Sequence, residues 1–133
     1  MDEDESLRRY GLYPVGVDLE EVRSLLTARA RLEKCAQGDG DTELMRLCCV
    51  QLFNAGSPDD VLLIWQAKTA SMDADCSIGI QLPCGGGLPR TKAYLSEQRS
   101  PEADAALRRL NLCEAAGDFE GFSVEVHAAY YAP

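Results

Sequence analysis

The stretch Ser57–Asp75, SPDDVLLIWQAKTASMDAD, predicts the centre of the fold. It carries the signals of a helix start: Ser57 can cap the helix, Pro58 suits the first helical position, and two aspartates favour the positive helix end. Apolar side chains would lie on almost every side of this helix, among them Trp65, the only tryptophan. A helix that is apolar nearly all round must be covered from several directions. We therefore expect it to run through the middle of the core, with Trp65 as a core residue.

The segments before this stretch carry helical patterns of their own. Apolar residues at three- and four-residue spacing predict an amphipathic helix from Asp18, its cap, to about residue 36. A second, largely apolar helix is predicted at Thr42–Ala55, with Asp41 as its cap. Because only Gly56 separates this helix from the central stretch, we expect the two to pack as an αα-hairpin.

The C-terminal half is predicted to be helical as well. Pro89 opens one short helix, and Ser100 with Pro101 opens another that reaches about residue 116. A last helix over residues 119–131 places four apolar side chains on one face, which we expect to dock on the body of the protein. These are Phe122, Val126, Ala129 and Tyr130.

Residues 76–84, CSIGIQLPC, allow two interpretations. The alternation of Ile78, Ile80 and Leu82 would suit a strand, but no partner strand is evident and one strand cannot form a sheet. We therefore favour a short helix that ends near Pro83.

The predicted fold class is all-α. It is a compact irregular bundle or a short solenoid of about six to seven helices built from antiparallel helical hairpins. The solenoid is suggested by the Ser-Pro-acid start, which occurs at Ser57 and again at Ser100, a period of about 43 residues that suits paired-helix repeats. A length of 133 residues fits a single domain, residues 1–133, in which the acidic residues 1–6 are expected to be disordered.

A net charge of −9 limits the kinds of partner. It would repel the phosphates of nucleic acid and anionic membrane surfaces, so we expect neither as a partner. No apolar run approaches the roughly 20 residues that span a bilayer, and the acidic start MDEDESLRRYG lacks the apolar part of a signal peptide. We therefore expect a cytoplasmic protein that binds a protein partner with a basic surface.

The cysteines and the single histidine do not form a metal or catalytic pattern. Cys48 and Cys49 would point about 100° apart on a helix. Cys76 and Cys84 lack the spacing of zinc ligands, although they could form a regulatory disulfide. In a reducing compartment all six thiols are expected to be buried small hydrophobes, and His127 a partly exposed helix residue. We predict no catalytic residue, no metal and no cofactor.

One segment has the composition of an anion site. Residues 85–87, three glycines, provide flexible backbone ahead of a helix that carries Arg90, Thr91 and Lys92. Pro89 removes an N–H from this turn, and the spacing differs from that of a phosphate-binding P-loop. A helix-breaking turn is the favoured interpretation. A site for an anionic or phosphorylated small molecule, used by a small enzyme or binding protein, is the alternative.

The charged side of the first long helix is the predicted partner surface. It carries Glu20, Glu21, Arg23 and Arg31. We predict a non-enzymatic protein-interaction domain, either an adaptor or an immunity-type inhibitor. In size and charge only, the chain resembles bacterial immunity proteins, which neutralise basic toxins. A further alternative is a structural subunit of a larger assembly, which would expose an apolar patch.

Overall fold

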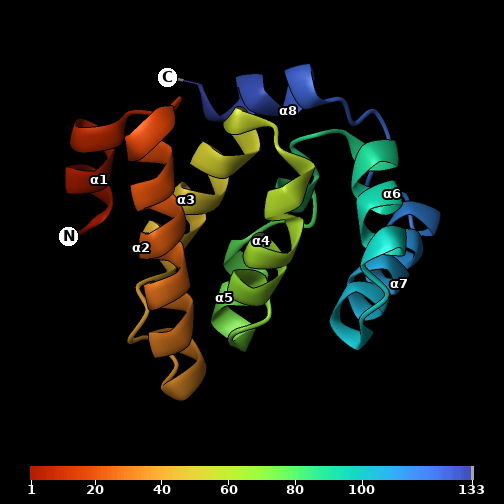
Figure 1. Ribbon diagram of the computed structural model, residues 1–133, viewed down its shortest axis with the longest axis horizontal. Helices are drawn as coiled ribbons and strands as arrows, with labels where there is room; N and C mark the ends of the chain where they lie inside the picture. Colours follow the sequence, from red (N-terminus) through yellow and green to blue (C-terminus); the bar gives the residue numbers. More distant parts are fainter. Residues whose placement is uncertain (133) are drawn as a thin grey trace.

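The computed structural model describes residues 1–132, and all regular structure within them is helical (Figure 1). The described residues form eight α-helices: α1 (Glu3–Tyr10), α2 (Gly16–Cys35), α3 (Thr42–Ala55), α4 (Val61–Lys68), α5 (Met72–Ser77), α6 (Leu88–Gln98), α7 (Pro101–Ala115) and α8 (Val124–Tyr131). Two short 3₁₀ turns, η1 (Pro58–Asp60) and η2 (Leu82–Cys84), precede α4 and α6. The all-α class is confirmed, with eight helices instead of six to seven. Antiparallel hairpins stay a prediction. None of the described helices combines the length and apolar character needed to cross a bilayer.

Local capping signals set the starts of two helices as predicted. Asp41 caps α3, because its side chain accepts a hydrogen bond from the Leu44 N–H at 3.2 Å. Ser100 caps α7 by accepting from the Ala103 N–H at 3.1 Å. In contrast, α2 begins at Gly16 without a side-chain cap, so the predicted start at Asp18 is corrected.

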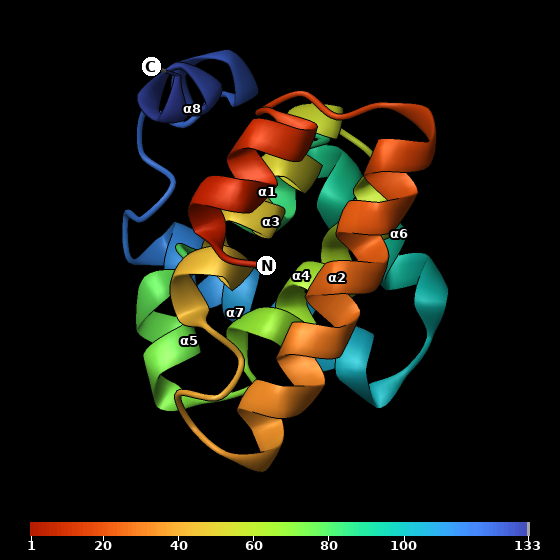
Figure 2. The same ribbon diagram turned by 90° about the vertical axis from the view of Figure 1, so that its left-hand side faces the viewer.

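The N-terminal residues are helical, which corrects the expectation that residues 1–6 are disordered. Asp2 caps α1 by accepting from the Glu5 N–H at 2.9 Å, and Ser6 is buried. The acidic first turn and the basic last turn, which holds Arg8 and Arg9, both suit the helix dipole. Figure 2 shows α1 beside α3, and it also packs against α2. A local cap and a favourable charge order thus stabilise a helix that has little apolar surface of its own.

The stretch Ser57–Asp75 is not one helix but two, which corrects the prediction. The chain leaves the helix after Lys68, and α5 starts again where Ser71 Oγ accepts from the Ala74 N–H at 3.0 Å. The buried Lys68 ammonium explains the break, since it donates to the main-chain carbonyls of Asp75, at 2.8 Å, and of Ile78. A buried ammonium needs acceptors, and these carbonyls lie within reach only because the chain turns back.

The core consists of two clusters that meet at α4. The first lies between α2, α3, α4 and α5, and it contains Ile64 and Ala67. The second lies around α6 and α7 and includes Val61 from the start of α4. The central position expected for this stretch is therefore correct. Its neighbours differ from those expected: α4 packs mainly against α2, α5 and η2, so the predicted hairpin of residues 42–55 with 57–75 is not confirmed.

Helix α8 lies across one end of the other helices in both views and packs on α3 (Figures 1 and 2). It begins at Val124 rather than at residue 119, because Ser123 caps it and residues 117–123 form a loop. The predicted docking face is therefore right at Phe122, which packs on both core clusters, and wrong at the other three residues. Val126 and Tyr130 are 65% and 76% exposed and Ala129 is exposed, whereas Val124, Ala128 and Tyr131 of α8 pack on the core.

Residues 76–84 combine parts of both interpretations without forming a strand. Cys76 lies in the last turn of α5, which ends at Ser77. The chain is then irregular as far as Gln81, and η2 forms the end of the segment. The alternating residues Ile78, Ile80 and Leu82 are all buried. Ile78 and Leu82 belong to the first core cluster and Ile80 to the second, so this segment joins the two clusters. The favoured helix ending near Pro83 is corrected, because α5 ends at Ser77.

Candidate binding groove between α6, α7 and α8

The predicted partner surface on α2 is largely used to hold the fold. Arg23 makes a bidentate ion pair with Asp60 of η1, with Nε–Oδ1 and Nη2–Oδ2 distances of 2.9 and 3.0 Å. These hydrogen bonds raise the pKa of Arg23 above its ordinary value, and Glu20 also pairs with it. Glu21 accepts a hydrogen bond from the Tyr10 hydroxyl at 2.8 Å. Of the four predicted residues, only Arg31 is exposed and without an ion pair among the described residues.

The predicted anion-binding residues do not converge on one site. Thr91 is fully buried, and its hydroxyl donates to the Gly87 carbonyl of its own helix at 2.8 Å. Lys92 pairs with Glu114 of α7, and Arg90 is exposed at the surface of α6. Thr91 therefore stabilises the first turn of α6, Lys92 joins α6 to α7, and Arg90 faces solvent.

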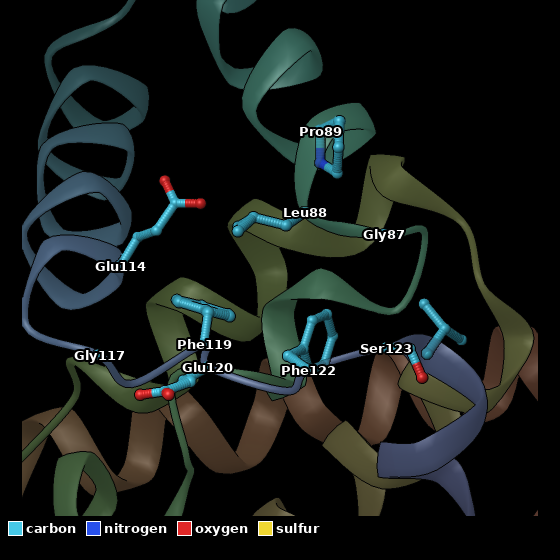
Figure 3. A pocket seen from close by; sticks show the side chains of 10 residues that line it. Gly87, Leu88, Pro89, Glu114, Gly117, Phe119, Glu120, Phe122 and Ser123 are labelled. Carbon is cyan, nitrogen blue, oxygen red and sulfur yellow. The ribbon is translucent and has the colours of Figure 1, made fainter.

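One hollow is bordered by α6, α7 and the start of α8 (Figure 3). It has a volume of about 590 Å³, and we call it the acidic groove. Its lining comes from the start of α6, the end of α7, the loop 117–123 and the first residue of α8: Gly87, Leu88, Pro89, Glu114, Gly117, Phe119, Glu120, Phe122, Ser123 and Val124.

The floor of the acidic groove is apolar and rigidly packed. Phe119 is buried, and its ring meets that of Phe122 edge to face with centroids 5.5 Å apart. Phe122 in turn packs edge to face on Phe53 of α3 at 6.5 Å. Figure 3 shows Leu88 above these two rings. The loop is therefore anchored by its phenylalanines even though it has no regular structure.

Two carboxylates border this apolar floor. Glu114 projects from α7 and pairs with Lys92, while its side chain stays 49% exposed. Glu120 lies on the loop, is exposed, and makes no ion pair with any described residue. Both stand on the same side of the groove in Figure 3. The site thus offers apolar contact area together with negative charge.

A smaller hollow of about 190 Å³ adjoins the acidic groove and shares Glu120 and Phe122 with it. His127 of α8 lines it and packs edge to face on Phe53 and Tyr131, at 5.3 and 5.2 Å. Burial, with a contribution from the nearby Arg46, lowers the pKa of His127 below its ordinary value. The imidazole therefore belongs to the aromatic packing that holds α8.

A separate hollow of about 420 Å³ lies between α2, α4 and the start of α7. We call it the Trp65 pocket, because that residue forms part of its wall. Trp65 packs against the second core cluster, as expected, but it is only partly buried. Arg109 lies over its ring, 5.8 Å from the centroid.

The cysteines follow the predicted pattern only in part. Cys48, Cys49 and Cys84 are buried, whereas Cys35 and Cys76 are exposed. Burial raises the pKa of Cys48 and of Cys84 to about 12, so both thiols stay protonated at neutral pH. All six cysteines are free, so Cys76 and Cys84 form no disulfide here. Within residues 1–132 there is no group of three or more His, Cys, Asp or Glu side chains that could hold a metal ion.

The predicted sites overlap two of the hollows in part, since Arg31 lines the Trp65 pocket and residues 87–89 of the glycine turn line the acidic groove. The loop 117–123 was not predicted as part of a site. Gly117 and Gly121 lie four residues apart around Asp118, Phe119 and Glu120, and two glycines so close together are a loop signal. Gly117 and Gly121 both have positive φ, 94° and 73°, so the helix predicted over residues 119–131 could not include this segment. The loop signal was available, but its position next to Leu88 and Glu114 was not.

Comparison of the chain with protein-family models, with curated proteins and with solved structures gave no match.

Proposed function

We propose that this chain is a non-enzymatic protein-interaction domain that binds a basic, partly apolar segment of a protein partner in the acidic groove. The observation that carries the proposal is the combination of an apolar floor, formed by Leu88, Phe119 and Phe122, with the carboxylates of Glu114 and Glu120. Interfaces typically place an apolar centre inside a polar rim. An arginine or lysine of the partner would meet the carboxylates while its neighbours cover the rings.

The overall charge supports the same class of partner. A net charge of −9 attracts basic surfaces over long distances and raises the rate of encounter with them. If the helices form a stack of antiparallel hairpins, as the sequence predicts, that shape would suit the binding of another macromolecule. Adaptors and immunity-type inhibitors both act by binding another protein. We propose that this protein acts in the cytoplasm.

Selection from a displayed library of random peptides tests this proposal. Peptides enriched on the immobilised protein should carry arginine or lysine beside apolar residues. Glu120→Lys should weaken their binding by about tenfold, because it reverses one charge on the rim. The matched control is Glu97→Lys, on the exposed surface of α6 and outside the groove, which should leave the affinity nearly unchanged.

Salt provides a second measurement. Binding through the carboxylates should weaken as ionic strength rises, and this dependence should be smaller for Glu120→Lys. Selected peptides without basic residues would contradict the proposal. So would an equal effect of the substitutions at Glu97 and Glu120.

The structural-subunit alternative keeps one observation in its favour. Tyr13, Val15 and Val17, between α1 and the first turn of α2, are 63%, 77% and 75% exposed. Apolar side chains gathered in this way often mark an interface. Light scattering over a range of concentrations tests self-association through this segment. A dimer that dissociates on Val15→Asp would support the alternative, and a monomer at every concentration would rule out its homo-oligomeric form.

A further inference from the structure

Helix α8 is held to the body of the protein by a shallow contact. None of its described residues is fully buried, and it packs mainly on α3. Val124, Ala128 and Tyr131 contact the first core cluster, and each of them stays partly exposed. Elements with little buried apolar area open at a small cost in free energy. A modest change in the energy of this contact is therefore enough to release α8.

His127 lies at the centre of the contact. Its ring packs against those of Phe53 on α3 and Phe122 in the loop 117–123, with centroids 5.3 and 5.7 Å away. On α8 itself, Tyr131 meets the imidazole edge to face at 5.2 Å, and Tyr130 stacks on it at 6.2 Å. The Tyr131 hydroxyl lies 3.3 Å from Nε2 of His127. These surroundings suit a neutral imidazole, because an imidazolium among the rings would lose hydration.

The charged groups around the imidazole do not offset this loss. Arg46 of α3 lies over the Tyr131 ring, 5.0 Å from its centroid, and it adds to the effect of burial, the larger cause, in lowering the pKa of His127. Asp118 and Glu120 line the small hollow with His127, but both are exposed to water, which screens their charges. Neither carboxylate contributes to the pKa of His127. A positive charge on the ring therefore opposes the docking of α8.

We propose that α8 is a pH-sensitive strap, docked while His127 is neutral and released when this residue is protonated. His127 is the only histidine, and histidine is the one side chain whose ordinary pKa lies between 5 and 8. Because docking lowers this pKa, the docked state is fully stable above the ordinary value of 6.5 and loses stability as the pH falls through the lowered value. Each unit by which docking lowers the pKa weakens docking about tenfold at low pH.

Release of the strap would alter the acidic groove, and this consequence rests on the function proposed above. Ser123, which caps α8, and Val124 line the groove beside Phe122. When α8 leaves, the groove loses the wall that these two residues form. Basic peptides selected at pH 7.5 should then bind less tightly at pH 5.5.

Proton NMR of the intact chain, without any partner, tests the strap. The single histidine gives one Hε1 signal, which measures its pKa directly, and the methyl signals of Val124 and Ala128 report on docking. Between pH 7.5 and 5.0 we expect these methyl signals to move toward the positions of an unfolded chain. Their midpoint should coincide with that of His127 and lie below 6.5. The methyl signals of Ile64, in the first core cluster, should stay constant.

Two variants separate the charge of the imidazole from its packing. His127→Phe keeps an aromatic ring that cannot be protonated, so α8 should stay docked at pH 7.5 and at pH 5.0. If this variant does not fold, His127→Gln provides a second neutral side chain with the same expectation. The matched control is Glu125→Gln, which removes an exposed acid of α8 and should leave the midpoint nearly unchanged.

The strap is ruled out if the signals of Val124 and Ala128 stay constant while His127 titrates. It is equally ruled out if they move in the neutral variant as they do in the parent. Because no partner is present, these outcomes do not depend on peptide binding in the acidic groove. Failure of basic peptides to bind at pH 7.5 would refute the proposed function alone.

Discussion

Replacing Asp75 by asparagine should destabilise the protein in a way that depends on pH. Asp75 accepts two hydrogen bonds from the Arg109 guanidinium, at 2.7 and 2.6 Å, and its Oδ1 lies 2.9 Å from Lys68 Nζ. Foremost the bonds from Arg109, and then the ammonium of Lys68, lower the pKa of Asp75 from 3.8 to about 2. The carboxylate therefore joins α5 to α4 and α7 through charges.

The magnitude follows from this shift. Each pKa unit is equivalent to about 1.4 kcal/mol, so the charged form of Asp75 stabilises the fold by about 2 kcal/mol at neutral pH. Because the folded-state pKa is depressed, this stability is fully present above the unfolded-state value, near 4. It is lost as the pH falls through the folded-state value, near 2. The difference between Asp75→Asn and the parent should therefore be about 2 kcal/mol at pH 7 and only a few tenths near pH 2.

Urea unfolding followed by circular dichroism at pH 7, 3 and 2 measures this difference. Asp73→Asn is the matched control, since Asp73 lies on the same helix but is exposed, and it should change the stability by less than about 0.5 kcal/mol. The reasoning is refuted if Asp75→Asn is as stable as the parent at pH 7. It is also refuted if the loss is the same at pH 7 and pH 3, because the effect would then not come from the charge.

Three further predictions concern other buried groups. Glu33→Gln should cost about 1–3 kcal/mol in urea unfolding, with a larger loss at pH 7 than at pH 3. The Glu33 carboxylate accepts from the Ser71 hydroxyl at 2.6 Å and from the Gly38 and Gly40 N–H groups, and these bonds, that from Ser71 first, lower its pKa. Gly85→Ala should lower the melting temperature by several degrees, because a Cβ there would lie 2.5 Å from the Phe53 carbonyl oxygen; a melting temperature equal to that of the parent would contradict the close packing. A thiol reagent should modify Cys35 and Cys76 rapidly in the folded protein and reach Cys48, Cys49 and Cys84 only on unfolding, and fast native labelling of all six would contradict their burial.

Local sequence signals predicted most of the helices correctly. Asp41 and Ser100 cap α3 and α7 through bonds to residues three positions away, so each start depends only on its own segment. The long amphipathic pattern after residue 18 likewise identified α2, apart from its first residues. Glycines with positive φ ended or excluded helices where a side chain would have been strained, as at Gly56 after α3.

Errors arose where distant contacts decided the outcome. Trp65 was expected to be buried because its neighbours are apolar, yet it stays partly exposed beside a pocket lined by residues of α2, α4 and α7. Arg23 and Glu21 were assigned to a partner surface because charges usually face solvent, yet Asp60 and Tyr10 hold them. In each case the deciding group lies on another helix. Its position could not be read from the local pattern.

By itself, the sequence determined that the protein is helical, where several helices begin, and that its net charge is −9. The tertiary structure decided that Ser57–Asp75 breaks in two, because the buried ammonium of Lys68 needs the carbonyls of Asp75 and Ile78 as acceptors. The tertiary structure also sets the positions of the acidic groove and the Trp65 pocket. Leu88, Glu114 and Glu120 line the acidic groove, and Arg31, Trp65 and Glu102 line the Trp65 pocket. Capping and periodicity act over three or four residues, whereas a binding site requires groups from separate helices to converge, and only the packed core sets their distances.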